Sequence, residues 1–235
     1  MPEQAQQFFL VTYGFKSSVL GDEDNKNIKF TEIKAQDFGQ KVTFQIGEKS
    51  YEINLNIAGE FQVFNILCAL AMVLSKHKFN EEDLRKVLKD FDKIIPASGR
   101  MQKVVNLANK AQVFIDFAHS PDALENVLKM ARNVAKSRLV VLFGCGGDRD
   151  PKKRPIMGKI ACDLADLVIV TDDNPRTENA ADVRSEILDN CDSVKTIEIA
   201  NRKDAIEASI NMLQENDILV LAGKGHEKYQ IIGDE

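Results

Sequence analysis

Four short stretches of the sequence carry most of the residues that could do chemistry. They run over residues 116–121, 144–150, 171–178 and 222–227, and each places charged or amide side chains beside glycine or proline. Carboxylates, an amide, guanidinium groups and glycines in one place suit a small ligand that bears both charge signs. The sequence therefore predicts a binding site for such a ligand, provided that the fold brings the stretches together.

Each of these stretches follows a short apolar segment, and such segments predict strands. The segments lie at 113–116, 139–143, 167–171, 196–199 and 217–222, with helical periodicity between them. Strands that alternate with amphipathic helices are typical of a parallel sheet covered on both faces. Because parallel strands end at one edge of the sheet, we expect the four stretches to meet there, in a mainly parallel α/β domain.

The first 95 residues show a different pattern, with strand-like alternation first and helical periodicity afterwards. The alternation predicts a hairpin at 42–46 and 51–57 and further strands at 8–11 and 28–33, with a loop at 21–27. Apolar residues then recur at helical spacing from Phe61, and Asn80 can cap a second helix. Pro96 and Gly99 interrupt both patterns, so we place the domain boundary near residue 95.

The composition excludes several classes of protein. The 36 acidic and 31 basic residues leave a net charge of -5, which gives no overall attraction to nucleic acid. The apolar runs are far shorter than the roughly 20 residues that span a membrane. Met1-Pro2-Glu3-Gln4 has no features of a secretory leader, and the four cysteines form no Cys-x-x-Cys pair. We expect a cytoplasmic protein that binds neither nucleic acid nor membrane.

Each motif taken alone also has a structural explanation. Glycines after a strand, such as those in the stretch Gly144–Gly147, are commonly turn residues, although this stretch could also bind phosphate. The adjacent Asp172 and Asp173 could ligate a metal, but acids at a strand end more often face solvent or cap a helix, so we predict no metal site. The triplet Lys152–Arg154 is typical of a solvated surface. Ser120 is expected to be the N-cap of a helix that begins at Pro121.

Taken in order and spacing, the motifs resemble those of the Mur ligase family. The resembling segments are 59–71, 98–101, 115–124, 143–150, 171–178 and 222–227, so the resemblance covers nearly the whole chain. It implies a Rossmann-like, mainly parallel C-terminal domain at 96–235, preceded at 1–95 by the last β-hairpin and helical part of a Mur ligase central domain. That domain's P-loop and carbamylated lysine are absent here, and Gly223-Lys224-Gly225 does not match a P-loop. We therefore expect a C-terminal fragment that is inactive alone and holds no catalytic residue.

The resemblance also implies a reaction. The chain is similar to ATP-dependent, ADP-forming amide ligases of peptidoglycan synthesis. These enzymes use Mg²⁺ and make an acyl phosphate that an amine attacks. The implied partners are UDP-N-acetylmuramoyl-L-alanyl-D-glutamate, meso-diaminopimelate and ATP. The implied nucleotide-binding residues are Arg100 on the phosphates, Asp116 on the ribose and His119 nearby.

For the amino acid, the resemblance implies a site made of Arg149, Asn174, Arg176, Gly223 and Glu227. The distal end of meso-diaminopimelate carries a carboxylate that lysine lacks, and Arg176 with Asn174 offers donors for it. Arg149 would bind another carboxylate, while Glu227 and the carbonyl of Gly223 would receive an ammonium. A lanthionine would satisfy the same groups.

Two other functions fit part of the sequence. A ligase that extends folate with glutamate shares the fold and mechanism but not the loop Asn174–Arg176. A non-catalytic Rossmann-like module that binds an amino acid or nucleotide fits the absence of a P-loop. Such a module would bind its ligand without ATP-dependent synthesis.

Overall fold

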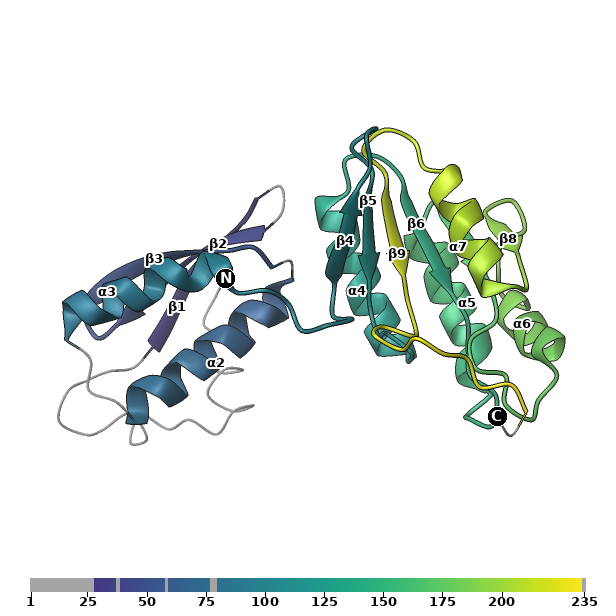
Figure 1. The fold of residues 1–235 in the computed structure, drawn as a ribbon, viewed down its shortest axis with the longest axis horizontal. Coiled ribbons are helices and arrows are strands. Elements are labelled where there is room, and N and C mark those ends of the chain that lie inside the picture. The colour runs from purple at the N-terminus through teal and green to yellow at the C-terminus, as the bar shows by residue number, and fades with distance from the viewer. Residues whose placement is uncertain (1–27, 37–38, 58, 77–79, 234–235) are drawn as a thin grey trace. The chain divides into compact units, whose positions relative to one another are not determined.

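The computed structural model describes residues 28–36, 39–57, 59–76 and 80–233 (Figure 1). The chain divides into two compact units, Met1–Ile95 and Pro96–Glu235. The predicted strand at 8–11 and the predicted loop at 21–27 lie outside the described residues. Within the described ranges, no helix combines the length and apolar character needed to cross a membrane.

The described residues of the first unit form a three-stranded antiparallel sheet followed by helices. Its strands pair in the order β1 (Ile28–Gln36), β2 (Gly39–Ile46) and β3 (Lys49–Leu55). The helices are α2 (Glu60–Lys76), α3 (Glu81–Lys89) and the short 3-10 helix η2 (Asp90–Lys93). The predicted hairpin is confirmed, because Val42 pairs with Ile53 and Phe44 with Tyr51. These apolar residues alternate along β2 and β3, so one face of the sheet is buried against the helices.

Asn80 caps α3, as the sequence predicts. Its Oδ1 accepts the backbone N–H of Asp83 at 2.9 Å. Leu84 and Leu88 lie one turn apart on the buried face of the helix. The cap and this apolar stripe together explain why the helix begins at Glu81 and packs on the sheet.

The second unit is a six-stranded sheet with helices on both faces. Across the sheet the strands are β4 (Gln102–Asn106), β5 (Gln112–Ile115), β9 (Ile218–Leu221), β6 (Leu139–Phe143), β7 (Leu167–Val170) and β8 (Thr196–Glu198). All neighbouring pairs are parallel except β4 with β5. The helices are α4 (Pro121–Val134), α5 (Lys153–Leu164), α6 (Ala180–Leu188) and α7 (Arg202–Asn211). The predicted mainly parallel α/β fold is confirmed.

The central strand β6 shows why this sheet is covered on both sides. Every one of its residues is apolar and buried. Leu139, Val141 and Phe143 belong to a core shared with α4, α5 and α6, whereas Val140 and Leu142 belong to a core shared with α7. Figure 1 shows α4 and α5 behind the sheet and α7 in front of it. The two helical layers leave the carboxyl edge of the strands free for a site.

Two local features differ from the sequence-based expectations. Residues 102–106, for which the sequence predicts no strand, form the edge strand β4, whose residues are mostly exposed and so lack an alternating apolar pattern. Ser120 does occupy the N-cap of α4, but its side chain makes no capping hydrogen bond. Only its backbone carbonyl is used, as the acceptor of the Leu124 N–H at 2.9 Å.

We expect Leu128→Ala to lower the free energy of unfolding of the second unit by about 2–5 kcal/mol, because it leaves a cavity in a closely packed core. Leu128 lies in α4 and is fully buried. Urea unfolding followed by circular dichroism measures the change. Val194→Ala is the control, since Val194 is 90% exposed and its loss should change the free energy by less than about 0.5 kcal/mol. Equal effects of the two substitutions would contradict the assigned core.

Candidate functional site

The loops that follow the parallel strands enclose a cavity of about 460 Å³. All five residues predicted to bind the amino acid line it, and they come from the loops after β6, β7 and β9: Arg149, Asn174, Arg176, Gly223 and Glu227. His119, from the loop after β5, also lines the cavity. These loops gather at the lower edge of the second unit in Figure 1. The structure therefore brings together residues that lie far apart in the chain, from His119 to Glu227.

Asn174 lies at the centre of this arrangement and is 5% exposed. Its Oδ1 accepts hydrogen bonds from Lys224 Nζ at 2.7 Å and from the backbone N–H of Ile231 at 3.0 Å. Its Nδ2 donates to Glu227 Oε2 at 3.2 Å. Every polar atom of the amide therefore has a protein partner, as a buried amide requires.

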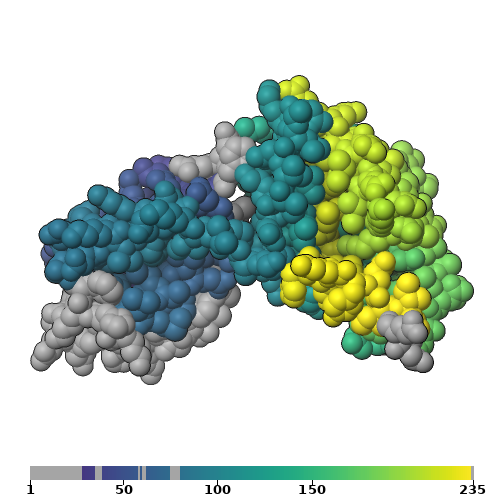
Figure 2. Space-filling model, in the orientation of Figure 1, coloured from purple at the N-terminus to yellow at the C-terminus, as the bar shows by residue number. Residues whose placement is uncertain are grey.

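Arg176 takes a backbone conformation that residues with a side chain seldom adopt, with φ at 50°. The conformation is held by its neighbours, since its N–H donates to the Ile231 carbonyl at 3.1 Å and its own carbonyl accepts the Gly233 N–H at 2.8 Å. Its guanidinium donates to the Gly147 carbonyl at 2.7 Å. The C-terminal segment that supplies these backbone contacts is yellow in Figure 2 and lies on the surface of the second unit. The guanidinium is thereby fixed at the cavity wall.

The two remaining polar groups of the predicted site differ in exposure. Arg149 is exposed, and its guanidinium donates to the carbonyl of Asp148 at 3.0 Å, which leaves other N–H groups for a ligand. Glu227 is half-buried. Burial opposes its ionisation, but hydrogen bonds from Lys224 and Asn174 outweigh burial and hold the pKa of the carboxyl below its usual value. The cavity therefore contains a carboxylate as well as guanidinium groups.

The loops at 144–150 and 171–178 are bonded directly to each other. The Gly147 N–H donates to the Asn174 carbonyl at 2.8 Å, and Asp148 accepts the hydroxyl of Thr177 at 2.7 Å. A Cβ atom on Gly147 would lie only 1.9 Å from the carbonyl oxygen of Pro175. The close approach of the two backbones explains why glycine is needed at this position.

Arg154 contradicts the expectation of a solvated basic triplet. Lys152 is exposed as predicted, but Arg154 is 1% exposed. Its guanidinium donates to Glu178 at 2.9 Å, to Glu186 at 2.9 Å and to the Gly146 carbonyl at 3.3 Å. The sequence gives no sign of this burial, because the two carboxylates come from a different part of the chain. Arg154 fastens the loop after β6 to the residues that precede and form α6.

The adjacent acids after β7 both lie close to a basic side chain of the protein. Asp172 forms an ion pair with Arg184, and Asp173, which is 9% exposed, lies 3.7 Å from the Nζ of Lys224. Across the described part of the chain, no group of three His, Cys, Asp or Glu side chains is placed to hold a metal ion. Asp172 thus links the loop to α6, and Asp173 adds a carboxylate to the lining of the cavity.

The three residues predicted to face a nucleotide lie close in sequence but differ in position. Asp116 is buried, which raises the pKa of its carboxyl, and its oxygens accept the N–H groups of Met101 at 2.7 Å and Ala118 at 2.8 Å. Arg100 is exposed, with its guanidinium 5.1 Å from the ring centre of Phe117. His119 Nδ1 lies 2.8 Å from the carbonyl of Phe117. Of the three, only His119 lines the cavity.

Two lysines near the cavity were not predicted as site residues. Lys153 lines the cavity, and its Nζ donates to the carbonyl of His119 at 2.8 Å. Lys224 lies behind the cavity and is 7% exposed. A lysine between two glycines at the end of a strand is the one sequence signal that could have pointed to Lys224.

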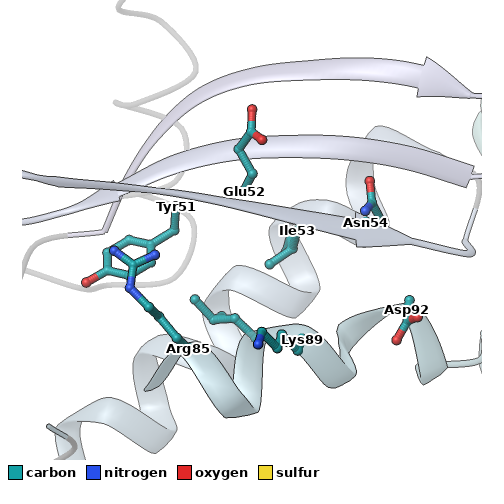
Figure 3. A pocket seen from close by; sticks show the side chains of 8 residues that line it. Tyr51, Glu52, Ile53, Asn54, Arg85, Lys89 and Asp92 are labelled. Atoms are coloured by element: carbon teal, nitrogen blue, oxygen red, sulfur yellow. The ribbon is translucent and has the colours of Figure 1, made fainter. Parts of the chain in front are cut away.

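A second cavity, of about 310 Å³, lies in the first unit between β3 and α3 (Figure 3). Arg85 reaches from α3 over the ring of Tyr51, with 5.2 Å between the guanidinium carbon and the ring centre. None of the residues predicted for the site lines this cavity. It therefore plays no part in the predicted chemistry.

Comparisons with known proteins match both units to one family. Residues 99–225 match the family model described as "Mur ligase, glutamate ligase domain", and residues 3–73 match "Mur ligase middle domain". The chain belongs to the Mur ligase family. The resemblance seen in the sequence motifs is confirmed.

Several Mur ligases of one activity are similar to this chain. The UDP-N-acetylmuramoyl-L-alanyl-D-glutamate--2,6-diaminopimelate ligase of Rickettsia bellii is 46% identical over 213 residues, which are 90% of this chain and 43% of that protein. The ligase of the same name from Brucella melitensis is 46% identical over 88% of this chain and 41% of that protein. The chain thus spans less than half the length of these relatives.

Solved structures support the same relationship. A structure of UDP-N-acetylmuramoyl-L-alanyl-D-glutamate--2,6-diaminopimelate ligase matches with a TM-score of 0.66 and 33% identity, over 91% of this chain and 43% of that one. A Mycobacterium tuberculosis folylpolyglutamate synthase also matches, with a TM-score of 0.66 over 86% of this chain and 46% of that one, at 20% identity. The second match shows a shared fold only.

We expect Arg154→Met to lower the free energy of unfolding by about 2 kcal/mol, because it removes charged hydrogen bonds and leaves Glu178 and Glu186 without their guanidinium. Urea unfolding measures the change. Lys152→Met, two positions away on the exposed surface, is the matched control and should be nearly neutral. A neutral Arg154→Met would show that the guanidinium does not hold the loops.

We expect the stabilising effect of Glu227 to depend on pH. Because its pKa in the folded protein is below the ordinary value of 4.5, the carboxylate stabilises the fold above that pH and loses this effect as the pH falls through the lowered pKa. The difference in free energy of unfolding between the wild type and Glu227→Gln should be about 1 kcal/mol at neutral pH and should shrink in acid. Urea unfolding over a pH series measures it, and a difference independent of pH would contradict the assigned hydrogen bonds.

Proposed function

We propose that this chain is the amino-acid-selecting part of an ATP-dependent, ADP-forming amide ligase of peptidoglycan synthesis. The ligase adds meso-diaminopimelate to the D-glutamate of UDP-N-acetylmuramoyl-L-alanyl-D-glutamate in the cytoplasm. One observation carries the proposal: a single cavity is lined by Arg149, Arg176, the amide of Asn174 and the carboxylate of Glu227. The names of the similar ligases agree with it.

The charges of the cavity complement those of the proposed amino acid. meso-Diaminopimelate carries two carboxylates and two ammonium groups at neutral pH. Arg149 and Arg176 supply the guanidinium groups for the carboxylates, while Glu227 and the Gly223 carbonyl accept from an ammonium. Lysine would leave Arg176 without its partner, and leaving such a group desolvated and unpaired costs about 1–3 kcal/mol.

In the proposed reaction, ATP transfers its γ-phosphoryl group to the side-chain carboxylate of the D-glutamate, and ADP leaves. The amine of the amino acid, once deprotonated, attacks the acyl carbon, and phosphate departs as the amide forms. The residues of this chain hold the distal end of the amino acid, so the other amine is oriented toward the acyl phosphate. Arg100, Asp116 and His119 are the residues proposed to face the nucleotide.

ATP and Mg²⁺ are the cofactors that the family relationship implies. Mg²⁺, when bound, neutralises charge on the phosphates during transfer. The described residues provide no cluster of carboxylates that fits this ion. The chain's own proposed contribution is therefore the choice and orientation of the amino acid.

We expect the chain to bind meso-diaminopimelate and to bind L-lysine at least about tenfold more weakly, because only the former pairs with Arg176. Isothermal titration calorimetry measures both affinities. Arg176→Ala should weaken meso-diaminopimelate binding by about tenfold, whereas Arg85→Ala, in the other unit, should leave it unchanged. Equal affinity for lysine would contradict the proposed substrate.

Turnover can be tested in a hybrid in which this chain replaces the matching part of the Rickettsia bellii ligase. Release of phosphate from ATP that requires meso-diaminopimelate would support the ligase. Binding without synthesis in the hybrid would support a non-catalytic amino-acid-binding module instead.

A further inference from the structure

Lys224 occupies a place where a lysine side chain is seldom found. Its side chain is 9% exposed and lies behind the cavity instead of in solvent. The residue stands between Gly223, with φ at 102°, and Gly225, with φ at 53°. Both glycines have backbone conformations that disfavour a side chain, so the sharp turn after β9 depends on them. This turn brings the lysine ammonium under the loop that follows β7.

The ammonium is surrounded by oxygen atoms from two loops. Lys224 Nζ donates to Asn174 Oδ1 at 2.7 Å and to Glu227 Oε2 at 3.2 Å, and it lies 3.7 Å from Asp173 Oδ1. An ammonium has three N–H donors, and three acceptors are within reach here. Lys224 itself does not line the cavity, although Asn174, Glu227 and Asp173 do.

These contacts fix which way the Asn174 amide points. The two partners of Oδ1 are the Lys224 ammonium and the Ile231 N–H, and both are only donors. The partner of Nδ2 is the Glu227 carboxylate, which only accepts. All three contacts require the same orientation of the amide. In this orientation the oxygen accepts from Lys224 and Ile231, and the NH₂ group donates to Glu227. A second N–H of that group is left to donate to a ligand.

The Lys224 ammonium also determines which oxygen of the Glu227 carboxylate stays free. The hydrogen bonds from Lys224 and Asn174 both end on Oε2, which leaves Oε1 outside these contacts. Lys224 also lies between two carboxylates that are mostly buried, those of Asp173 and Glu227. Without the ammonium, these two groups would repel each other in a poorly solvated place.

We propose that Lys224 is a positioning residue that makes Asn174 present an N–H and Glu227 a free carboxylate oxygen to the amino acid, and so sets the preference for a substrate with a distal carboxylate. This proposal rests on the proposed function. Lys224 acts without touching the substrate. A ligand that ended in an ammonium alone could still pair with Glu227, but it would leave the free N–H of Asn174 without a carboxylate to accept it.

The first experiment compares Lys224→Met with the wild type in the hybrid ligase, using meso-diaminopimelate and L-lysine as substrates. The Met variant keeps the unbranched side chain up to the ε position and removes the charge and the donors of the ammonium. We expect KM for meso-diaminopimelate to rise by about tenfold, the preference over lysine to fall by a similar factor, and KM for ATP to stay the same. Lys228→Met, on the exposed part of the same loop, should behave like the wild type.

A double substitution tests whether Lys224 acts through Asn174. In the Asn174→Ala background, Lys224→Met should cause little further loss of preference, because the amide that it orients is gone. A wild-type preference that survives Lys224→Met, or full additivity of the two changes, would overturn the proposal. If the Met variant does not fold, Lys224→Gln takes its place; it retains one donor for Asn174 and should show a smaller loss.

A substrate-independent measurement separates this proposal from the proposed function. The side-chain amide signals of Asn174 in ¹⁵N NMR spectra of the full chain report its hydrogen bonds directly. We expect Lys224→Gln and Lys224→Met to shift these signals and Lys228→Met to leave them in place. If the wild-type hybrid did not prefer meso-diaminopimelate, the proposed function would fail while the NMR shifts still supported the role of Lys224 in orienting Asn174; unchanged signals would overturn that role.

Discussion

Asn174, on the loop after β7, is hydrogen-bonded to the loop after β6 and to the chain segment after β9. Gly147 donates to its backbone carbonyl, Lys224 and Ile231 donate to its Oδ1, and its Nδ2 donates to Glu227. Its side chain reaches the chain after β9, and its backbone carbonyl makes the contact to the loop after β6. One residue can make both contacts only if the strands that carry these loops end at the same level. The parallel sheet provides that alignment, so the site depends on this amide and the amide depends on the fold.

The stiffness of the site comes from the layers beneath it. The strands β6, β7 and β9 are buried on both faces, and their apolar residues alternate between two cores. Arg154 also joins the loops, because its guanidinium donates hydrogen bonds to the carboxylates of Glu178 and Glu186. The guanidinium groups and the carboxylate that line the cavity are therefore held in place before a ligand binds. Less conformational entropy is then lost on binding.

The parts of this structure that could be predicted from the sequence are those with a local cause. Apolar runs predict β5, β6, β7 and β9, and the rule that parallel strands end together brings the residues after them into one cavity. The edge strand β4 escaped prediction because its mostly exposed residues show no alternation. Arg154 and Lys224 escaped it because their burial depends on carboxylates and amides from distant loops, such as Glu186 and Asn174. The sequence shows that a side chain is charged, but it does not show whether that side chain will be solvated or will pair with another residue.

The pairing of Arg176 with Ile231 and Gly233 has a practical consequence. Residues 230–233 look like a connecting segment, yet their backbone hydrogen bonds hold Arg176, which lines the cavity, in an unfavourable backbone conformation. A label, an affinity tag or a protease cut introduced in this segment would release that arginine. Experiments on this chain should therefore attach reporters elsewhere, and sequence changes within 230–233 should be interpreted as changes to the cavity.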